Sequence, residues 1–265
     1  MVNMGSRSKK VMTGLAPYLA ILLMVGLWQG ATWMLSIPDW LLPSPVVVWN
    51  RTRAWSTALP FHIGITLFET LTGFLAALVI GVPLAMIIVS SETLRRALYP
   101  PLVMLQVVPK IAIAPLFLIW VGYGMTSKLL MAFLVAFFPI VVATAAGLET
   151  IPAELLDMSR VLKASTMQVF LGIRLPWALP HIFSGMKVAI SLALIGAIIG
   201  EFVGSDTGLG YVIVAASGSM NTGLMFGAIV ILALMGIVLF ELIELLERWL
   251  CPWYVSSTSV VQAST

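Results

Sequence analysis

The amino-acid sequence predicts an all-α protein that crosses a lipid bilayer about six times. Of its 265 residues, 60% are hydrophobic and only 9% are charged, whereas soluble domains carry about 25% charged residues. With so few charges the chain cannot build a solvated surface of its own, so lipid must cover most of it. A helix needs about 20 apolar residues to cross a bilayer. Six segments meet this length: 14–36, 63–89, 98–121, 127–147, 180–200 and 223–246.

Composition also excludes several other classes of protein. The net charge is only +3, and the one basic run lies at residues 7–10, so nucleic-acid binding is excluded. One cysteine, Cys251, and two histidines provide neither an internal disulfide nor a metal cluster.

Two of the six segments carry features that affect their packing. The third is interrupted by Pro109 and Pro115, so it is the one segment that need not form a regular span. The fifth carries Gly196, Gly200 and Gly204 at a spacing of four residues. Small residues at this spacing let two helices approach closely. We expect this stripe to pack within the chain, with contact to a second copy as the alternative.

The distribution of lysine and arginine predicts the orientation, because cytoplasmic loops carry an excess of both. A cytoplasmic N-terminus places ten of these residues inside and three outside, with Lys110 within a span. The inside set is Arg7, Lys9, Lys10, Arg95, Arg96, Arg160, Lys163, Arg174, Lys187 and Arg248; the outside set is Arg51, Arg53 and Lys128. The sequence therefore predicts a cytoplasmic N-terminus over 1–13, a membrane domain over 14–250 with a cytoplasmic hairpin at 150–176, and a cytoplasmic tail over 251–265.

The hairpin begins with a helix that has one apolar face. Pro152 suits the first turn of a helix, and Glu154 lies favourably near its positive end. Leu155, Met158 and Leu162 then recur at a spacing of three and four residues.

A second, shorter helix follows in the same hairpin. Ser165 and Gln168 have the spacing of a capping box, and Met167, Phe170 and Ile173 follow along one side. We expect Leu175-Pro176 and Pro180 to end this helix before the fifth span. Two short helices with an apolar ridge favour docking of a soluble partner, although the pattern equally fits a hairpin that lies on the membrane surface.

The hairpin resembles the cytoplasmic signature of the permease subunits of bacterial ABC importers of the type I fold. That signature reads Glu-Ala-Ala, three residues, Gly, nine residues and Ile-x-Leu-Pro. The matching positions here are Asp157-Met158-Ser159, Lys163 and Ile173-Arg174-Leu175-Pro176. Lys163 stands where the family has a glycine that serves a tight turn. The turn must therefore avoid a positive φ at this position or tolerate strain of about 1 kcal/mol.

Further motifs extend the resemblance over nearly the whole chain. They are Leu42-Pro43-Ser44-Pro45, Val108-Pro109-Lys110, Pro115-Leu116, Trp120–Gly124, Gly200-Glu201-Phe202 and Gly208–Tyr211. These motifs are similar to those of the subfamily that imports sulfonates, taurine, nitrate and related small organic compounds, whose relatives also carry thiamine-precursor pyrimidines or flavins. Many relatives have an arginine near the start of the second span, where this chain has Glu69.

This resemblance implies a multi-pass protein of the bacterial cytoplasmic (inner) membrane that acts as a homodimer. Its partners would be an ATP-binding subunit, which binds ATP and Mg, and an extracytoplasmic solute-binding protein. The chain has no Gly-x-x-x-x-Gly-Lys-Ser/Thr motif, so we expect no enzymatic activity, cofactor or catalytic residue in it. The ATPase-docking residues implied are Leu155, Asp157, Met158, Ser159, Leu162, Lys163, Phe170, Ile173, Leu175 and Pro176.

Ionisable side chains at membrane depth are functional candidates, because burial of charge in lipid is costly. Lys110 beside Pro109 either lines the translocation path or extends its ammonium towards water. We expect Glu69 and Glu201 to be solvated near the outer ends of their spans, with a place in the path as the alternative. Glu244 and Arg248 are spaced for an ion pair at the inner end of the last span.

Two other classes of membrane protein are alternatives to an importer subunit. An ion-coupled secondary transporter would often show internal repeats and paired buried carboxylates, and no repeat is visible here. An intramembrane enzyme would need clustered catalytic residues, and we expect His62 and His181 to lie at opposite faces of the membrane.

Overall fold

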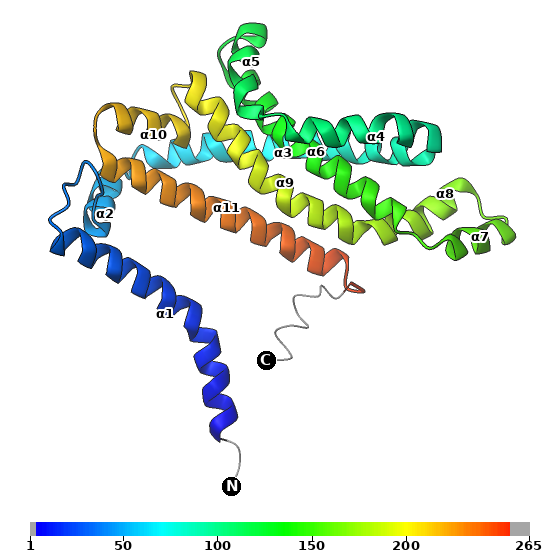
Figure 1. Ribbon diagram of the computed structural model, residues 1–265, viewed down its shortest axis with the longest axis horizontal. Helices are drawn as coiled ribbons and strands as arrows, with labels where there is room; N and C mark the ends of the chain where they lie inside the picture. Colours follow the sequence, from blue (N-terminus) through cyan, green and yellow to red (C-terminus); the bar gives the residue numbers. More distant parts are fainter. Residues whose placement is uncertain (1–3, 255–265) are drawn as a thin grey trace. The chain divides into compact units, whose positions relative to one another are not determined.

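The computed structural model describes residues 4–254, with side chains from Leu19 onward except that of Thr166. Within that range every regular element is a helix, as the sequence predicts (Figure 1). The predicted tail over 251–265 is described only as far as Tyr254, so residues 255–265 lie outside the described part. The elements are α1 (Met4–Met34), α2 (Pro45–Ala54), α3 (Leu59–Ser90), α4 (Glu92–Val107), η1 (Lys110–Ile113), α5 (Ala114–Val121), α6 (Met125–Glu149), α7 (Ala153–Val161), α8 (Thr166–Val169), η2 (Phe170–Arg174), α9 (Leu175–Gly204), α10 (Leu209–Gly218) and α11 (Thr222–Leu250).

Four helices of the described chain are long and apolar enough to cross a membrane. They span Leu59–Ser90, Met125–Glu149, Met167–Gly204 and Thr222–Leu250. The expected span over 98–121 is instead two helical pieces bent by 87°. Pro109 lies at the break, where its ring removes a backbone N–H donor. Counted as one span, this pair raises the number to five.

The first expected span lies in α1 and is only partly described. Its described portion, Leu19–Met34, is an apolar helix shorter than a span, and the side chains of 14–18 lie outside the described residues. The segments that we expect outside the membrane contain two short helices that sequence analysis did not predict, α2 and α10.

The chain divides into two compact units, and the first consists of residues 1–60 and 212–231. Helix α2 begins at a proline whose preceding residue, Ser44, accepts a hydrogen bond from the N–H of Val47. The beginning of α11 lies close against α2, because a Cβ atom on Gly223 would lie 2.8 Å from Arg51. Glycine therefore permits the close approach of these two helices.

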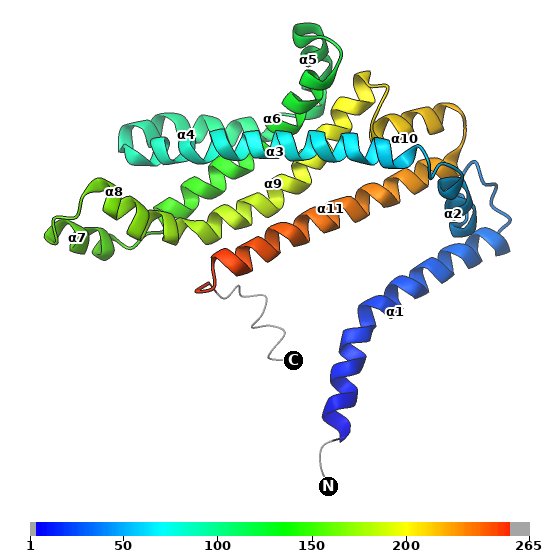
Figure 2. The ribbon, with the colours of Figure 1, turned by 180° about the vertical axis from the view of Figure 1, so that it is seen from behind.

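The second unit contains residues 61–211 and 232–254 of the described chain, and α6 and α9 run alongside each other through it (Figures 1 and 2). A Cβ atom on Gly196 would lie 2.7 Å from the carbonyl oxygen of Met131, and one on Gly200 would lie 2.9 Å from Cα of Lys128. Gly73 of α3 similarly faces Ala132 of α6. A Cβ atom on Gly204 would lie 2.8 Å from the ring of Tyr123, so the expectation that the glycine stripe packs within the chain is confirmed for all three glycines.

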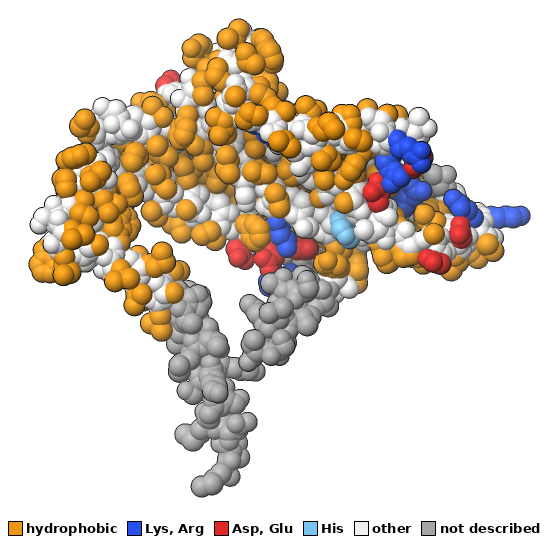
Figure 3. Space-filling model, viewed as in Figure 1, with side chains coloured by type: hydrophobic (Ala, Val, Ile, Leu, Met, Phe, Trp, Pro, Cys, Tyr) orange, Lys and Arg blue, Asp and Glu red, His pale blue; other side chains and the backbone are white. Residues whose placement is uncertain are grey.

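Apolar side chains form both the interior and much of the surface of the second unit. Its core joins α3, α6, α9 and α11 through buried residues that include Phe74, Ile140, Phe183, Ile190 and Leu239. Figure 3 shows apolar side chains spread over most of one face, with charged side chains gathered near α7 and the start of α4. A surface of this kind is typical of a protein that is solvated by lipid.

Candidate functional site: a helical docking segment and buried charge clusters

The predicted hairpin forms a helical segment, 150–176, which we call the docking segment. Helix α7 ends in a Schellman motif, in which the N–H of Ala164 donates to the carbonyl of Ser159 and the N–H of Lys163 donates to that of Arg160, both at 3.0 Å. Lys163 lies at the position where this motif favours glycine, and its φ is +51°. The turn therefore keeps the geometry that a glycine would provide and tolerates the strain of a lysine in the left-handed region.

The capping box at the start of α8 is confirmed. The N–H of Ser165 donates to Oε1 of Gln168 at 2.8 Å, and the N–H of Gln168 donates back to Oγ of Ser165 at 3.3 Å.

The expectation that Leu175-Pro176 and Pro180 end the second helix is wrong. Residues Met167–Gly204 form one continuous helix of 38 residues. A π-helical turn at η2 leads directly into α9, with the N–H of Leu175 donating to the carbonyl of Phe170. Pro176 lies directly after this turn, inside the continuous helix, where the altered π-helical hydrogen bonding accommodates a residue that has no N–H.

The docking segment exposes large apolar side chains to solvent. Met158 and Leu162 are 54% and 69% exposed, and Val161, which the periodicity did not select, is 82% exposed. Two further exposed apolar residues were not among the predicted docking residues. Met167 was predicted only as part of the apolar side of the second helix, and Leu171 was not selected at all. A helical face of this kind is normally covered, either by a partner protein or by the membrane surface.

The remaining predicted docking residues differ in accessibility. Asp157 and Lys163 are exposed, whereas Ser159 is buried and donates its hydroxyl to the carbonyl of Leu156 at 2.6 Å. Ser159 therefore stabilises α7 from within. The half-buried members of the predicted set are Leu155, Phe170, Ile173, Leu175 and Pro176.

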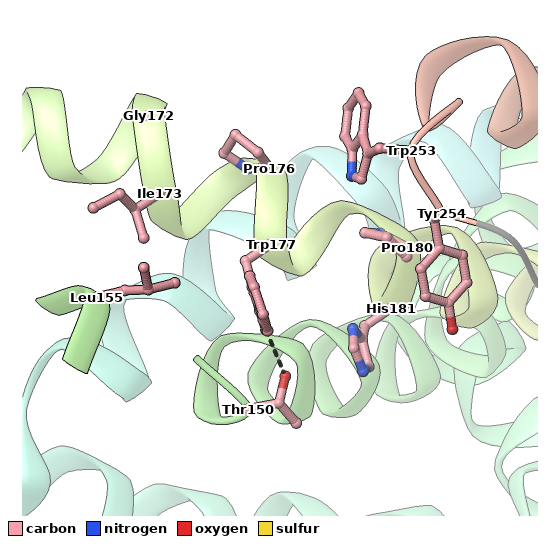
Figure 4. Close-up of a pocket in the computed structure, with 10 residues that line it drawn as sticks. All are labelled: Thr150, Leu155, Gly172, Ile173, Pro176, Trp177, Pro180, His181, Trp253 and Tyr254. Carbon is pink, nitrogen blue, oxygen red and sulfur yellow. Dashed lines mark hydrogen bonds between the residues drawn. The ribbon is translucent and has the colours of Figure 1, made fainter. Parts of the chain in front are cut away.

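Two cavities adjoin the docking segment. One, of about 790 Å³, extends from Leu155 and Ile173 to Trp253 and Tyr254 after α11 (Figure 4). Within it the indole N–H of Trp177 donates to Oγ1 of Thr150 at 3.3 Å. The other cavity, of about 730 Å³, is lined by residues of α7, η2 and the end of α3. Part of the segment therefore faces open space rather than neighbouring helices.

A buried ion pair joins α3 to the first turn of α6. The Lys128 ammonium lies 2.6 Å from the Glu69 carboxylate, and Lys128 also donates to Oγ of Ser205 at 3.0 Å. The expectation that Glu69 is solvated is wrong, because Glu69 is 0% exposed. Lys128, assigned to the outside set of charges, is 4% exposed and lies in α6.

Glu201 is also buried, at 1% exposure, so its expected solvation is wrong as well. Its carboxyl group accepts hydrogen bonds from the hydroxyl of Thr66 at 2.6 Å and from the N–H of Gly210 at 2.5 Å. Glu201 therefore bonds α9 both to α3 and to the start of α10. No sequence signal reveals these partners, since Thr66 and Glu201 are 135 residues apart.

A second buried ion pair lies between α9 and α11. Lys187 Nζ is 2.5 Å from a Glu247 oxygen, and both side chains are largely buried. The predicted pair of Glu244 and Arg248 is confirmed and is more exposed. Burial raises the pKa of the neighbouring Cys251 thiol, and the negative charge of Glu247 adds to that effect.

Lys110 lies at the bend after α4. Its ammonium donates to the carbonyl of Gln106 at 2.8 Å and lies 5.3 Å from the ring centroid of Phe138. The interrupted helix leaves that carbonyl without its usual N–H partner, and the lysine side chain supplies one. The geometry is thus compatible with either of the two roles expected for Lys110.

Known proteins resemble the chain over most of its length. The riboflavin transport system permease protein RibX of Chloroflexus aurantiacus is 38% identical and covers 89% of each chain. The formylaminopyrimidine transport permease protein ThiX of Halalkalibacterium halodurans is 35% identical and covers 92% of this chain and 98% of its own. Relatives named for transport of aliphatic sulfonates, taurine and nitrate are 29–32% identical, which confirms the resemblance to that subfamily.

A solved structure supports the fold. An inward-facing conformation of the MetNI methionine ABC transporter matches with a TM-score of 0.64 and 20% identity, covering 71% of this chain and 94% of the other. Residues 77–254 match the family described as "Binding-protein-dependent transport system inner membrane component". The chain therefore belongs to this family, and it is the membrane-spanning permease subunit of an ABC importer rather than an enzyme or an ion-coupled secondary transporter.

Proposed function

We propose that the docking segment is the surface on which the importer's ATP-binding subunit binds. Family membership implies an ATPase and a solute-binding protein as partners, and the exposed apolar side chains support this location. Met158, Val161 and Leu162 extend from a short helix and its C-terminal turn outside the long spans. An amphipathic helix of this kind fits a hydrophobic groove of a soluble protein.

The exposure of the segment refines the set of docking residues. Met158 and Leu162, with the exposed charges of Asp157 and Lys163, form the contact surface. Leu155, Phe170, Ile173, Leu175 and Pro176 support it from a half-buried position, and Ser159 holds α7 in shape.

The docking segment is connected directly to the spans, and this connection would couple ATP hydrolysis to transport. Because η2 continues into α9, a displacement of the docking segment also displaces α9, which packs closely on α6. Closure of the ATPase on ATP binding would draw the docking segments of two permease copies together and turn the spans outward. Hydrolysis would restore the inward-facing state, so the docking segment couples two conformational equilibria.

We further propose a homodimer with both termini in the cytoplasm of a bacterium, and the multi-pass chain in its inner membrane. Without the two buried lysines, Lys128 and Lys187, the count of basic residues is nine inside and two outside, which supports the same orientation. Residues 1–13 and 251–265 are then cytoplasmic, and 14–250 form the membrane domain.

The proposed substrate is a small polar or anionic organic solute such as a sulfonate, taurine or nitrate. Pro109 and Lys110 at the bend are the residues that we favour for lining the translocation path. The carboxyl groups of Glu69 and Glu201 are instead occupied by bonds to Lys128 and Thr66. A second candidate is a pyrimidine or a flavin, because relatives named for these compounds are 35% and 38% identical, above the 29–32% of the first group.

Co-purification of the ATPase tests the docking proposal. The double variant Met158→Asp/Leu162→Asp should lose ATPase association while the permease still inserts and purifies. Thr93→Asp/Ala97→Asp, which places the same two charges on exposed sites of α4 four residues apart, is the matched control. Undiminished recovery of ATPase with the double variant would exclude this surface.

A further inference from the structure

The buried groups between α3, α6, α9 and the loop after α9 have an unbalanced set of charges. Two carboxyl groups, Glu69 and Glu201, are 0% and 1% exposed, and one ammonium group, Lys128, is 4% exposed. An isolated charge in such surroundings is strongly unfavourable unless it is paired. One ammonium can balance only one of the two carboxylates.

Lys128 is committed to Glu69. Its ammonium lies 2.6 Å from a Glu69 oxygen, and a further bond goes to Oγ of Ser205. Within the described residues no salt bridge to Glu201 is present. Glu201 therefore has no cation of its own.

The remaining titratable groups around Glu201 do not supply a positive charge. Nδ1 of His62 accepts the N–H of Gly208 at 3.1 Å, so this nitrogen carries a lone pair and the imidazole is neutral. Tyr211 stacks on His62 with 5.8 Å between ring centroids, and a tyrosine side chain cannot supply a positive charge. The start of α10 contributes only about half an elementary charge.

Water has little access to the Glu201 carboxyl group. A Cβ atom placed on Gly208 would overlap both oxygens of Glu201, and one placed on Gly210 would lie 2.7 Å from Oε2. The loop backbone thus lies directly on the carboxyl group and takes the place of solvent.

Glu69 belongs to the same buried cluster as Glu201, because its partner Lys128 also bonds to Ser205 of the loop that covers Glu201. Apart from Lys128, no N–H or hydroxyl donor in the described chain reaches the Glu69 oxygens. The cluster therefore holds two carboxyl groups and a single cation, and ionisation of both would leave one buried negative charge uncompensated.

We propose that this cluster is a binding site for one proton, which Glu201 holds. The site is then neutral overall, with one ion pair and one carboxylic acid. The neutral acid keeps its bonds to Thr66 and Gly210, so the start of α10 stays bonded to α9 and the loop of residues 205–208 stays closed over the carboxyl group.

The proton makes the attachment of this loop depend on pH. If the loop opens, Glu201 meets water and ionises as an ordinary carboxyl group does. Ionisation favours the open loop increasingly as pH rises, and a lower pH favours the closed loop. This inference is independent of where the ATPase docks.

Infrared spectroscopy of the purified chain in detergent tests the proposal directly. At neutral pH the wild type should show the C=O stretch of a protonated carboxylic acid, and Glu201→Gln should remove it. Glu201→Gln should also keep the melting temperature of the wild type, since an amide preserves a neutral group. Glu69→Gln should lower it by several degrees, because Lys128 then lacks its counter-ion.

Absence of the carboxylic-acid band from the wild type would overturn the proposal, and so would a band that persists in Glu201→Gln. If Glu201→Gln does not fold, Glu201→Asp tests whether the carboxylic-acid band belongs to residue 201. The band should shift in frequency in this variant, and an unshifted band would place the proton on another residue.

A second measurement follows the loop itself. In a Cys251→Ser background, the maleimide labelling rate of Thr207→Cys, relative to that of the exposed Asp206→Cys, should rise with pH. The added change Glu201→Gln should abolish that rise. An identical pH dependence with and without Glu201 would contradict the proposal.

Discussion

Lys128 and Glu69 form an ion pair in which the side chains are only 5% and 0% exposed. Removal of one partner from a buried pair typically costs about 3–5 kcal/mol, because an uncompensated charge remains. We therefore expect Lys128→Met to lower the melting temperature of the detergent-solubilised protein sharply. The double variant Lys128→Met/Glu69→Gln should recover part of that loss. Additive effects of the two changes would show that the groups do not interact.

Lys163 offers a test of backbone strain, because its φ is +51° in a Schellman motif. Lys163→Gly should stabilise the turn by up to about 1 kcal/mol, since glycine adopts this conformation without steric penalty. Lys163→Val should destabilise it, because a β-branched residue is disfavoured at positive φ. Hydrogen exchange at Ala164 measures both effects, with slower exchange in the glycine variant and faster exchange in the valine variant. Equal protection in all three proteins would show that the turn is not strained.

The close approach of α9 to α6 depends on Gly196. A Cβ atom at this position would lie 2.7 Å from the carbonyl oxygen of Met131 and 2.8 Å from Cα of Ala132, so Gly196→Ala should destabilise the protein by about 1–3 kcal/mol. Gly30→Ala is the control, because nothing lies within 4 Å of the added atom there. Thermal unfolding in detergent should separate the two variants, and equal melting temperatures would argue against the packing of α9 on α6.

Cys251 should react slowly with maleimide at neutral pH. Burial raises the pKa of its thiol and Glu247 adds to that shift, so little of the reactive thiolate is present. A group whose pKa is raised loses its proton only at higher pH, and the labelling rate should increase there. In a Cys251→Ser background, Trp253→Cys should label readily at neutral pH because position 253 is 58% exposed. Equal rates at the two sites would show that Cys251 is accessible.

Local patterns in the sequence predicted the features that lie within a single helix. Each depends on residues three or four apart: the capping box of Ser165 and Gln168, the pair of Glu244 and Arg248, and the packing stripe that includes Gly196. Such neighbours are fixed by helical geometry, so spacing is sufficient to predict them.

The buried charges could not be predicted in the same way. Depth within an apolar span places Glu69 and Glu201 near an outer end, but their burial depends on partners that are distant in the sequence, Lys128 for Glu69 and Thr66 for Glu201. The continuity of α8, η2 and α9 was also missed, because a proline pair suggests a break. A single π-helical turn directly before α9 accommodates Pro176 within the continuous helix.

If the ATP-binding subunit docks as proposed, the continuous helix from Met167 to Gly204 would act as a lever arm. At a rise of about 1.5 Å per residue, its 38 residues extend about 57 Å. Its first turns belong to the docking segment, and Glu201 lies in its last turn. A displacement of the docking segment would then reach the carboxyl cluster along a single helix, and the π-helical turn is the point where that helix can flex.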